Sequence, residues 1–214
     1  MEFDNRSVNG PPPVYIVDDD SGFRKSITSL TRAVGFSPRP FSEPDDLLDE
    51  LDSIAPGIFL IDIRMPQRNG LDLLQEIRDR DCHWPAAIIT GHGEIPLAVR
   101  AMKLGAIEFL EKPFSHQALE EALRTGTKKL SAAAEKTKQA KAVDQFENKL
   151  TERQKEVFYG VVSGLTSKEI GRKLGLSHRT IEAYRVDMMK NLDMNSLAEL
   201  MELKVILREM KSEI

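Results

Sequence analysis

The stretch VYIVDDDSG, residues 14–22, places an apolar run directly before three adjacent carboxylates. The apolar run is typical of a buried strand, and the Asp residues follow where that strand ends. Neighbouring carboxylates repel one another, so a positive group is expected close to them. The rest of the sequence indicates both the fold that buries this run and the nature of the positive group.

Short apolar runs recur over the first 125 residues and alternate with amphipathic segments, such as the one containing Leu71, Leu74 and Ile77. This alternation is typical of an open parallel sheet with helices on both faces. We therefore predict a doubly wound α/β domain with five parallel strands. The strands are expected at 14–18, 37–41, 57–62, 86–90 and 107–111, and the helices near 21–34, 43–53, 70–81, 94–104 and 115–125.

The 214-residue chain is long enough for two domains, and its charge is unevenly distributed. Residues 1–125 hold 13 Lys and Arg against 21 Asp and Glu, whereas residues 145–214 hold 12 against 11. The less acidic second part is therefore the one expected to meet nucleic acid. The chain has one cysteine, no secretory signal at its start and no apolar run of membrane-spanning length, so we expect a cytoplasmic protein without membrane contact.

The sequence divides into four segments. Residues 1–13 end in Gly-Pro-Pro-Pro and are expected to be disordered, and residues 14–125 form the α/β domain. Residues 126–147 are rich in Ala, Lys and Gln, which predicts a solvated helical linker. Residues 148–214 predict an all-α domain, in which two short helices on either side of GLS at 175–177 form a helix-turn-helix.

Polar side chains lie at the ends of four predicted strands. Because the carboxyl ends of parallel strands share one edge of a sheet, we expect these side chains to meet. Carboxylates, a hydroxyl and an ammonium in one pocket suit a hard cation and a phosphoryl group, which indicates Mg²⁺ as the expected cofactor. The residues are Asp18 and Asp19 at the end of the first strand, Asp62 at the end of the third, Thr90 at the end of the fourth and Lys112 after the fifth.

The chemistry of these groups predicts their roles. Asp62, at the end of the central strand, is the carboxylate expected to act as nucleophile and become an aspartyl phosphate. Asp18, Asp19 and Asp62 are expected to bind the metal, together with a backbone carbonyl near Arg64. The ammonium of Lys112 would pair with the phosphoryl group once it is attached.

Four motifs occur in order: VDDD at 17–20, LIDIRMP at 60–66, TGHG at 90–93 and EKPF at 111–114. Together they make residues 14–125 resemble the receiver domain of two-component response regulators, a flavodoxin-like fold. The resemblance implies that a sensor histidine kinase transfers a phosphoryl group to Asp62.

The same resemblance implies a switch within the receiver. Thr90 is expected to move toward the phosphoryl group and hydrogen-bond to it, while the aromatic ring of Phe109 swings inward. Asp62, Thr90 and Lys112 are then the catalytic residues of the site. A cis peptide bond is expected between Lys112 and Pro113.

Residues 177–192, SHRTIEAYRVDMMKNL, form the candidate recognition helix. One face is expected to be core and contains Ile181, Tyr184, Met188 and Leu192. On the opposite face, Ala183 and Val186 would let the helix enter a major groove and touch thymine methyl groups. The other predicted DNA contacts are Arg179 and Glu182 to base edges, Lys168, Arg172, Lys173, Arg185 and Lys190 to phosphates, and His178.

Residues 148–212 resemble a LuxR-type DNA-binding domain, and the chain from residue 14 onward resembles the FixJ/NarL subfamily of transcriptional regulators. The resemblance implies a homodimer on promoter DNA and activation through contact with RNA polymerase. One departure is Asn195, where the family often has Arg, so one phosphate contact is expected to be missing.

Three alternatives to a phosphorylation-dependent transcriptional regulator remain. A phosphohydrolase would also pass through an aspartyl phosphate, but Arg64 stands where its second Asp is expected. A scaffold or phosphate sink would use the helical domain to bind protein. A constitutive DNA-binding protein would carry an inactive receiver. We expect the chain to catalyse only its own phosphorylation and dephosphorylation, and otherwise not to be an enzyme.

Overall fold

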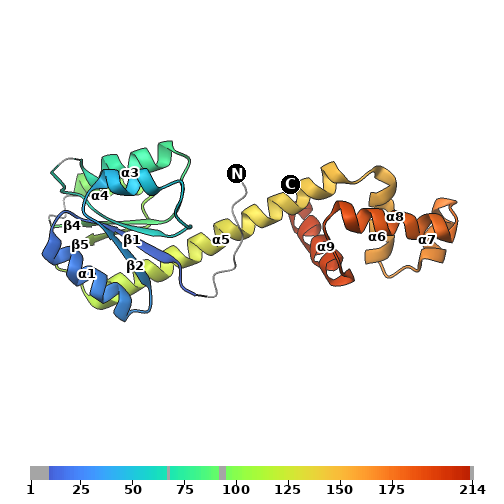
Figure 1. The fold of residues 1–214 in the computed structure, drawn as a ribbon, viewed down its shortest axis with the longest axis horizontal. Coiled ribbons are helices and arrows are strands. Elements are labelled where there is room, and N and C mark those ends of the chain that lie inside the picture. The colour runs from blue at the N-terminus through green and yellow to red at the C-terminus, as the bar shows by residue number, and fades with distance from the viewer. Residues whose placement is uncertain (1–9, 67, 92–94, 213–214) are drawn as a thin grey trace. The chain divides into compact units, whose positions relative to one another are not determined.

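A computed structural model describes residues 10–66, 68–91 and 95–212 (Figure 1). The chain forms two compact units, with the boundary between Ala133 and Ala134. Most of the expected N-terminal tail and His92 of the TGHG motif lie outside the described residues. None of the helices in the described segments has the length and hydrophobicity that a membrane span requires.

The first unit is built on a parallel sheet with the strand order β2-β1-β3-β4-β5. This confirms the predicted doubly wound fold, and the order reverses beside β1, which creates a switch point between β1 and β3. The strands are β1 (Pro13–Val17), β2 (Ser37–Phe41), β3 (Ile58–Asp62), β4 (Ala86–Thr90) and β5 (Glu108–Glu111). The helices are α1 (Ser21–Ala33), α2 (Pro44–Glu50), α3 (Gly70–Asp79), α4 (Ile95–Lys103) and the first part of α5 (His116–Lys149).

Helices cover both faces of the sheet, because successive side chains of a strand point to opposite sides (Figure 1). Tyr15 and Val17 of β1 pack in one core cluster with residues of α2, α3 and α4. Val14 and Ile16 pack in another cluster with residues of α1 and α5. The apolar run that opens the sequence is therefore buried on both sides, as strands in parallel sheets usually are.

Side-chain caps fix the loops that follow β1 and β3. The side chain of Asp20 caps α1 and accepts hydrogen bonds from the backbone N–H of Gly22 at 2.7 Å and of Phe23 at 2.9 Å. Asn69 caps α3 and accepts from the N–H of Leu71 at 2.8 Å. These caps satisfy backbone donors that a helix start leaves free, and they hold the loops that carry the acidic residues.

Helix α5 is continuous from His116 to Lys149 and passes through the predicted boundary at residues 125 and 126. Its Gly126 packs against β3, since a Cβ atom there would lie 2.9 Å from Cδ1 of Ile58. Residues 131–138 are all exposed, but the predicted solvated linker 126–147 is too long: Gly126 packs on the first unit, and Phe146, at 1% exposed, belongs to the core of the second.

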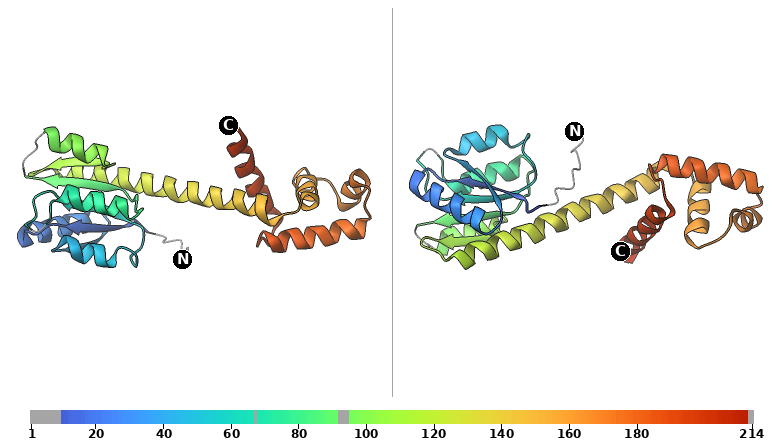
Figure 2. Two further views of the ribbon diagram at one scale, coloured as in Figure 1. Left: turned by 90° about the horizontal axis from the view of Figure 1, so that it is seen from above. Right: turned by 60° about the horizontal axis from the view of Figure 1, so that its bottom comes forward.

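The second unit contains the end of α5 and the helices α6 (Glu152–Val162), α7 (Ser167–Leu174), α8 (His178–Asn191) and α9 (Leu197–Ser212), drawn from light orange to red in Figure 2. Capping boxes open α6 at Thr151 and α7 at Thr166. Gly164 follows α6 and Gly175 caps α7, with φ angles of 81° and 69° that favour glycine.

The core of the second unit joins all of its helices. Phe146 of α5 stacks edge-on against Phe158 of α6, with ring centroids 4.9 Å apart. On α8, the predicted core residues Ile181 and Met188 are buried, as is Leu192 just after the helix. Tyr184 departs from the prediction, because it is only half-buried at the margin of this core.

Gly70 is required by the close approach of α3 to the end of β3. A Cβ atom at this position would overlap the carbonyl oxygen of Asp62 and lie 2.9 Å from Cγ2 of Ile61. Gly70→Ala should therefore lower the free energy of unfolding by about 2 kcal/mol or more, since the backbone must shift to make room.

Urea unfolding measures this effect, with Gly91→Ala as the control because nothing lies within 4 Å of a Cβ atom there. Equal stability of the Gly70→Ala variant and the original chain would contradict the close packing of α3 on β3.

Candidate functional site

One ammonium group lies between two buried carboxylates at the carboxyl edge of the sheet. Nζ of Lys112 is 2.8 Å from Oδ2 of Asp18 and 2.6 Å from Oδ1 of Asp62. Asp18 is 2% exposed and Asp62 is 6% exposed. Buried charges require a partner, and Lys112 supplies one to both carboxylates in this structure, whereas the sequence led us to expect Mg²⁺ in that role.

The sheet topology brings these three residues together. Asp18 follows β1, and Asp62 is the last residue of β3, which pairs with β1 so that Val17 is opposite Ile61. Lys112 follows β5, and its backbone N–H donates to the carbonyl oxygen of Thr90 at 2.7 Å. Segments that are far apart in the sequence thus meet at one edge of the sheet.

Backbone N–H groups hold the remaining carboxylate oxygens. Oδ2 of Asp62 accepts from the N–H of Arg64 at 2.7 Å, and Oδ1 of Asp18 accepts from the N–H of Asp20 at 2.9 Å. Each carboxylate therefore has one oxygen on Lys112 and the other on the backbone, which fixes its orientation.

Burial and charge act on this cluster in opposite directions. Burial raises the pKa of Asp18 above its ordinary value, although the hydrogen bond and charge of Lys112 oppose that rise. Burial alone would lower the pKa of Lys112, but hydrogen bonds to Asp18 and Asp62 and their charges raise it. Lys112 is thus held as an ammonium, and ionisation of Asp18 is costly.

The donors at this edge fit Mg²⁺, an ion that favours oxygen and usually keeps several waters while binding only one or two carboxylates. Asp18 and Asp62 supply buried carboxylate oxygens, and the exposed Asp19 belongs to the same loop. Within the described residues, no three His, Cys, Asp or Glu side chains form a ready-made metal cluster. A cation would compete with the ammonium of Lys112 for the two buried carboxylates.

The two residues of the predicted switch lie on neighbouring strands. Thr90 ends β4 and is completely buried, and Phe109 of β5 is half-buried against the core on the α3 side of the sheet. The peptide bond between Lys112 and Pro113 is cis, as expected. The movement of Thr90 and Phe109 stays a prediction.

Sequence reasoning missed Phe23. Nζ of Lys112 lies 3.6 Å from the centroid of the Phe23 ring, which places the ammonium over the aromatic face. The available signal was the position of Phe23 in the first turn of the helix after VDDD, a turn that starts beside the acidic site.

The second candidate site is the exposed side of α8 and of α7 before it. Val186 is 65% exposed, and Ala183 is exposed as well. Their exposure leaves these small apolar side chains free to contact bases in a major groove, as predicted. The other predicted contacts that are exposed are His178, Arg179 and Lys190 on α8, and Lys168, Arg172 and Lys173 on α7.

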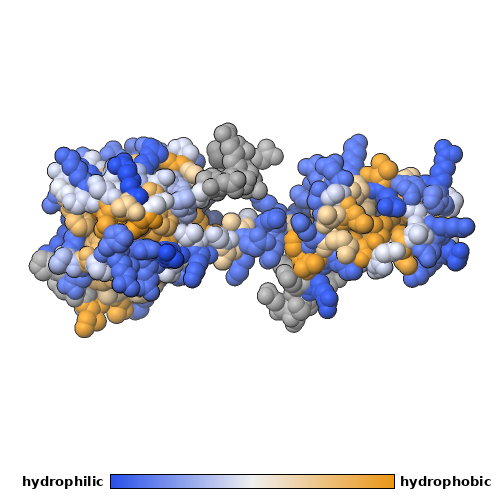
Figure 3. Space-filling model, turned by 90° about the horizontal axis from the view of Figure 1, so that it is seen from below, coloured by the Kyte–Doolittle hydropathy of each residue, from blue (hydrophilic) through white to orange (hydrophobic). Residues whose placement is uncertain are grey.

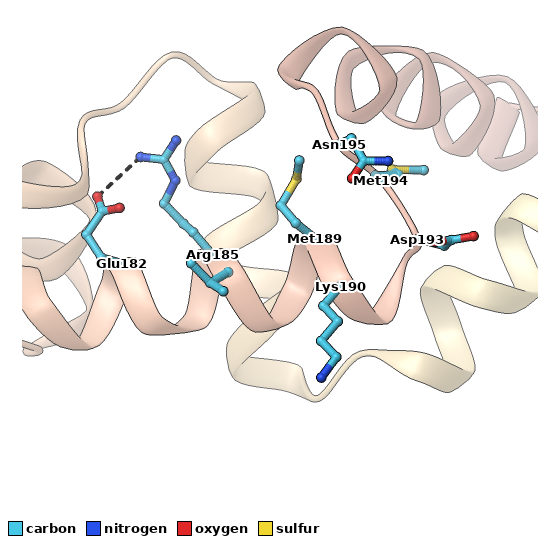
Figure 4. Close-up of a pocket in the computed structure, with 8 residues that line it drawn as sticks. Glu182, Arg185, Met189, Lys190, Asp193, Met194 and Asn195 are labelled. Atoms are coloured by element: carbon cyan, nitrogen blue, oxygen red, sulfur yellow. Dashed lines mark hydrogen bonds and ion pairs between the residues drawn. The ribbon is translucent and has the colours of Figure 1, made fainter.

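Two of the predicted DNA contacts also bind within the unit. Nη1 of Arg185 lies 2.8 Å from Oγ of the buried Ser167. It also lies 3.4 Å from Oε1 of Glu182, as Figure 4 shows. A hydrogen bond with Ser167 and the charge of Arg185 hold the pKa of Glu182 below its usual range. Arg185 therefore ties α8 to α7, in contrast with Lys190, which extends away from that contact (Figure 4).

A groove of about 560 Å³ runs beside α8 and the loop that follows it. Val186, Met189 and Lys190 line it from the helix, and Met194 and Asn195 line it from the loop. Asn195 is exposed, and its backbone N–H donates to Oε2 of Glu199 at 2.9 Å. A neutral amide thus lines the groove where the resemblance led us to expect a cation.

The surface of the second unit mixes apolar and charged side chains, and Figure 3 shows an orange area bordered by blue. Among its large apolar residues, Val186 of α8 and Leu197, Met201 and Val205 of α9 are strongly exposed. Val186 is the one of these that lies among the predicted DNA contacts.

Asp18→Asn should raise the midpoint of urea unfolding at pH 7 in the absence of divalent cations. Because the folded-state pKa of Asp18 is raised, its ionised form costs stability at pH 7. This cost is absent below the unfolded-state pKa of about 4. The stabilisation should therefore disappear as the pH falls toward 4.

Unfolding curves at both pH values test this, with Asp79→Asn on the exposed side of α3 as the control. A destabilised Asp18→Asn variant at pH 7 would contradict the stated balance of burial and charge.

Comparison with known proteins places both sites in context. The model of the response regulator receiver domain matches residues 14–124, and that of the LuxR family of bacterial regulatory proteins matches residues 148–203. The transcriptional regulatory protein FixJ of Bradyrhizobium diazoefficiens is 37% identical over 190 residues, which cover 89% of this chain and 93% of the relative.

Solved structures agree with this assignment. The response regulator StyR is 34% identical, with a TM-score of 0.66 over 91% of this chain and 98% of that one. Full-length FixJ from B. japonicum is 36% identical, with a TM-score of 0.57 over 92% of this chain and 97% of that one. The chain therefore belongs to the response regulators that combine a receiver domain with a LuxR-family DNA-binding domain, and it is a FixJ-like transcriptional regulator.

Proposed function

We propose that this chain activates transcription when a sensor histidine kinase phosphorylates Asp62. The observation that carries the proposal is the setting of the Asp62 carboxylate. It lies at the end of the central strand, with the ammonium of Lys112 on one oxygen and the N–H of Arg64 on the other. A carboxylate held in this way is oriented for attack, and the positive charge beside it favours the arrival of a phosphoryl group.

The transfer requires one bond to form and one to break. An Asp62 oxygen attacks the phosphorus of a phosphohistidine, a phosphorus–oxygen bond forms, and the phosphorus–nitrogen bond breaks as the imidazole leaves and takes up a proton. Lys112 neutralises charge on the transferred group. Mg²⁺, held by Asp18, Asp19, Asp62 and a backbone carbonyl near Arg64, would supply further neutralisation when bound. Attack of water on the same phosphorus later releases inorganic phosphate and restores the carboxylate.

This chemistry defines the only catalysis in the proposal. The receiver catalyses its own phosphorylation and dephosphorylation and turns over no other substrate. The place of Arg64, two residues after Asp62, supports this view, because a phosphohydrolase of this type would have an acidic residue there.

Phosphorylation then shifts a two-state equilibrium. The hydroxyl of Thr90 hydrogen-bonds to the phosphoryl group, and Phe109 moves inward. Two observations support this step: Thr90 is completely buried at the edge of the site, and Phe109 lies at the margin of the core rather than fully within it.

The output is binding of α8 to promoter DNA. Arg179, Ala183 and Val186 would face base edges, while the exposed Lys and Arg side chains on α7 and α8 would contact phosphates. We propose that the phosphorylated chain binds two half-sites as a homodimer, because two linked modules gain from effective concentration. Contact of this dimer with RNA polymerase would produce activation.

The first test is phosphoryl uptake. Incubation of the full chain with Mg²⁺ and acetyl phosphate should add one phosphoryl group, measured by intact mass, and should shift the chain to a dimer on a sizing column. Asp62→Asn should show neither change, because an amide cannot act as the nucleophile. Asp72→Asn, an exposed position on α3, is the control and should behave as the original chain does. No uptake by the original chain, or equal uptake by Asp62→Asn, would contradict the proposal.

The second test separates the two kinds of cation on α8. Lys190→Ala should weaken binding to any duplex and reduce the slope of log affinity against log salt by about 1, because one phosphate contact is lost. Arg185→Ala should instead lower the free energy of unfolding by about 1 kcal/mol or more, because the hydrogen bond from Arg185 of α8 to the buried Ser167 hydroxyl of α7 is lost. Fluorescence anisotropy over a range of salt concentrations and urea unfolding measure the two effects. An unchanged salt slope for Lys190→Ala would argue against α8 as the DNA-binding helix.

A further inference from the structure

The ammonium of Lys112 has a third partner besides its two carboxylates. A lysine ammonium carries three N–H donors, and those of Lys112 reach Asp18 and Asp62 at 2.8 and 2.6 Å. Nζ also lies 3.6 Å from the centroid of the Phe23 ring, well inside the range of about 6 Å in which an aromatic face attracts a cation. The side chain of Lys112 is only 22% exposed, so water screens this attraction little.

Phe23 is held in position through both its backbone and its ring. The backbone N–H of Phe23 donates to the side chain of Asp20 at 2.9 Å, and the N–H of Asp20 donates to Oδ1 of Asp18 at 2.9 Å. The ring of Phe23 packs edge-on against the ring of Phe114, with centroids 6.1 Å apart. Contacts therefore form a closed circuit from Asp18 through Asp20 and Phe23 to Lys112 and back to Asp18.

Phe23 can remain a partner of Lys112 throughout phosphoryl transfer, whereas the two carboxylates cannot. Asp62 ceases to be a free carboxylate when it becomes an acyl phosphate, and Asp18 would share its oxygens with a divalent cation. The Phe23 ring attracts the ammonium through its quadrupole but carries no net charge. It therefore does not repel the incoming phosphoryl group, and it offers no oxygen for which a metal would compete with Lys112.

We propose that Phe23 is a positioning residue for Lys112. Its ring face keeps the ammonium in place while the partner of that ammonium changes from the Asp62 carboxylate to a phosphoryl oxygen. This inference rests on the proposed phosphorylation of Asp62, and it adds a residue of α1 to the machinery of that site.

The test compares rates of phosphoryl uptake from acetyl phosphate in the full chain. Phe23→Leu removes the aromatic face, and replacement of Phe23 by 3,4,5-trifluorophenylalanine keeps the shape but withdraws electron density from the face. Phe36→Leu, in the loop after the other end of α1, is the matched control for loss of a partly buried ring. Phe23→Leu should slow uptake about fivefold or more, and the fluorinated chain should also be slower. Phe36→Leu should keep the original rate.

A second measurement does not depend on phosphorylation. Without phosphodonor, the NMR signals of the Lys112 ε-methylene and ammonium protons should be shifted upfield by the ring current of Phe23. That shift should vanish in Phe23→Leu and persist in Phe36→Leu.

The outcomes separate the two proposals. Uptake by Phe23→Leu and by the fluorinated chain at the original rate would overturn the positioning role. A rate lost in Phe23→Leu but fully kept in the fluorinated chain would overturn it too, because shape alone would then suffice. If the original chain takes up no phosphoryl group, phosphorylation of Asp62 fails, and with it the role of Phe23 in transfer. The ring-current shift would then decide only whether the ring contacts the ammonium.

Discussion

The contact of one ammonium with two buried carboxylates is the interaction that organises the carboxyl edge of the sheet in the first unit. Without Lys112, Asp18 and Asp62 would place two negative charges close together in a nearly dry site, which is costly. The sheet order makes the contact possible, because β1 and β3 are neighbours and the loop after β5 reaches back to the same edge. The same arrangement holds a positive charge where the proposed phosphoryl group would be attached. Stability and chemistry at this edge therefore have one physical cause.

The two units meet different physical demands along one chain. Leu119 and Leu123 of α5 belong to the core of the first unit, and Phe146 of the same helix belongs to the core of the second.

The cations on α7 and α8 of the second unit have two different roles. Arg185 binds Ser167 and Glu182 and stabilises the pairing of α7 with α8, whereas Lys190 and the exposed cations of α7 remain accessible to an anionic partner. This division lets the unit present positive charge without giving up its internal contacts.

Much of this organisation could be predicted from the sequence, because the relevant signals are local or topological. Apolar runs marked the strands, and the parallel order implied that Asp18, Asp62 and Lys112 would meet. The remainder depends on tertiary neighbours that no local pattern reveals. The ring of Phe23 reaches Lys112 only because α1 starts beside the loop after β5, and Tyr184 lies at the margin of a core whose extent α9 helps to set. The need for glycine at positions 70 and 126 likewise follows only from the fold, because Asp62 and Ile58 leave no room there for a Cβ atom.

If chemistry at Asp62 controls DNA binding by α8, as we propose, phosphorylation changes the affinity of the full chain for its DNA sites. The full chain is equilibrated with a random-sequence duplex library, with and without acetyl phosphate and Mg²⁺, and the affinities of the enriched duplexes are then determined for both states. The phosphorylated chain should bind its preferred duplexes about tenfold more tightly or better, a coupling of ordinary size between two sites. Equal affinity of the two states for the same duplexes would contradict it.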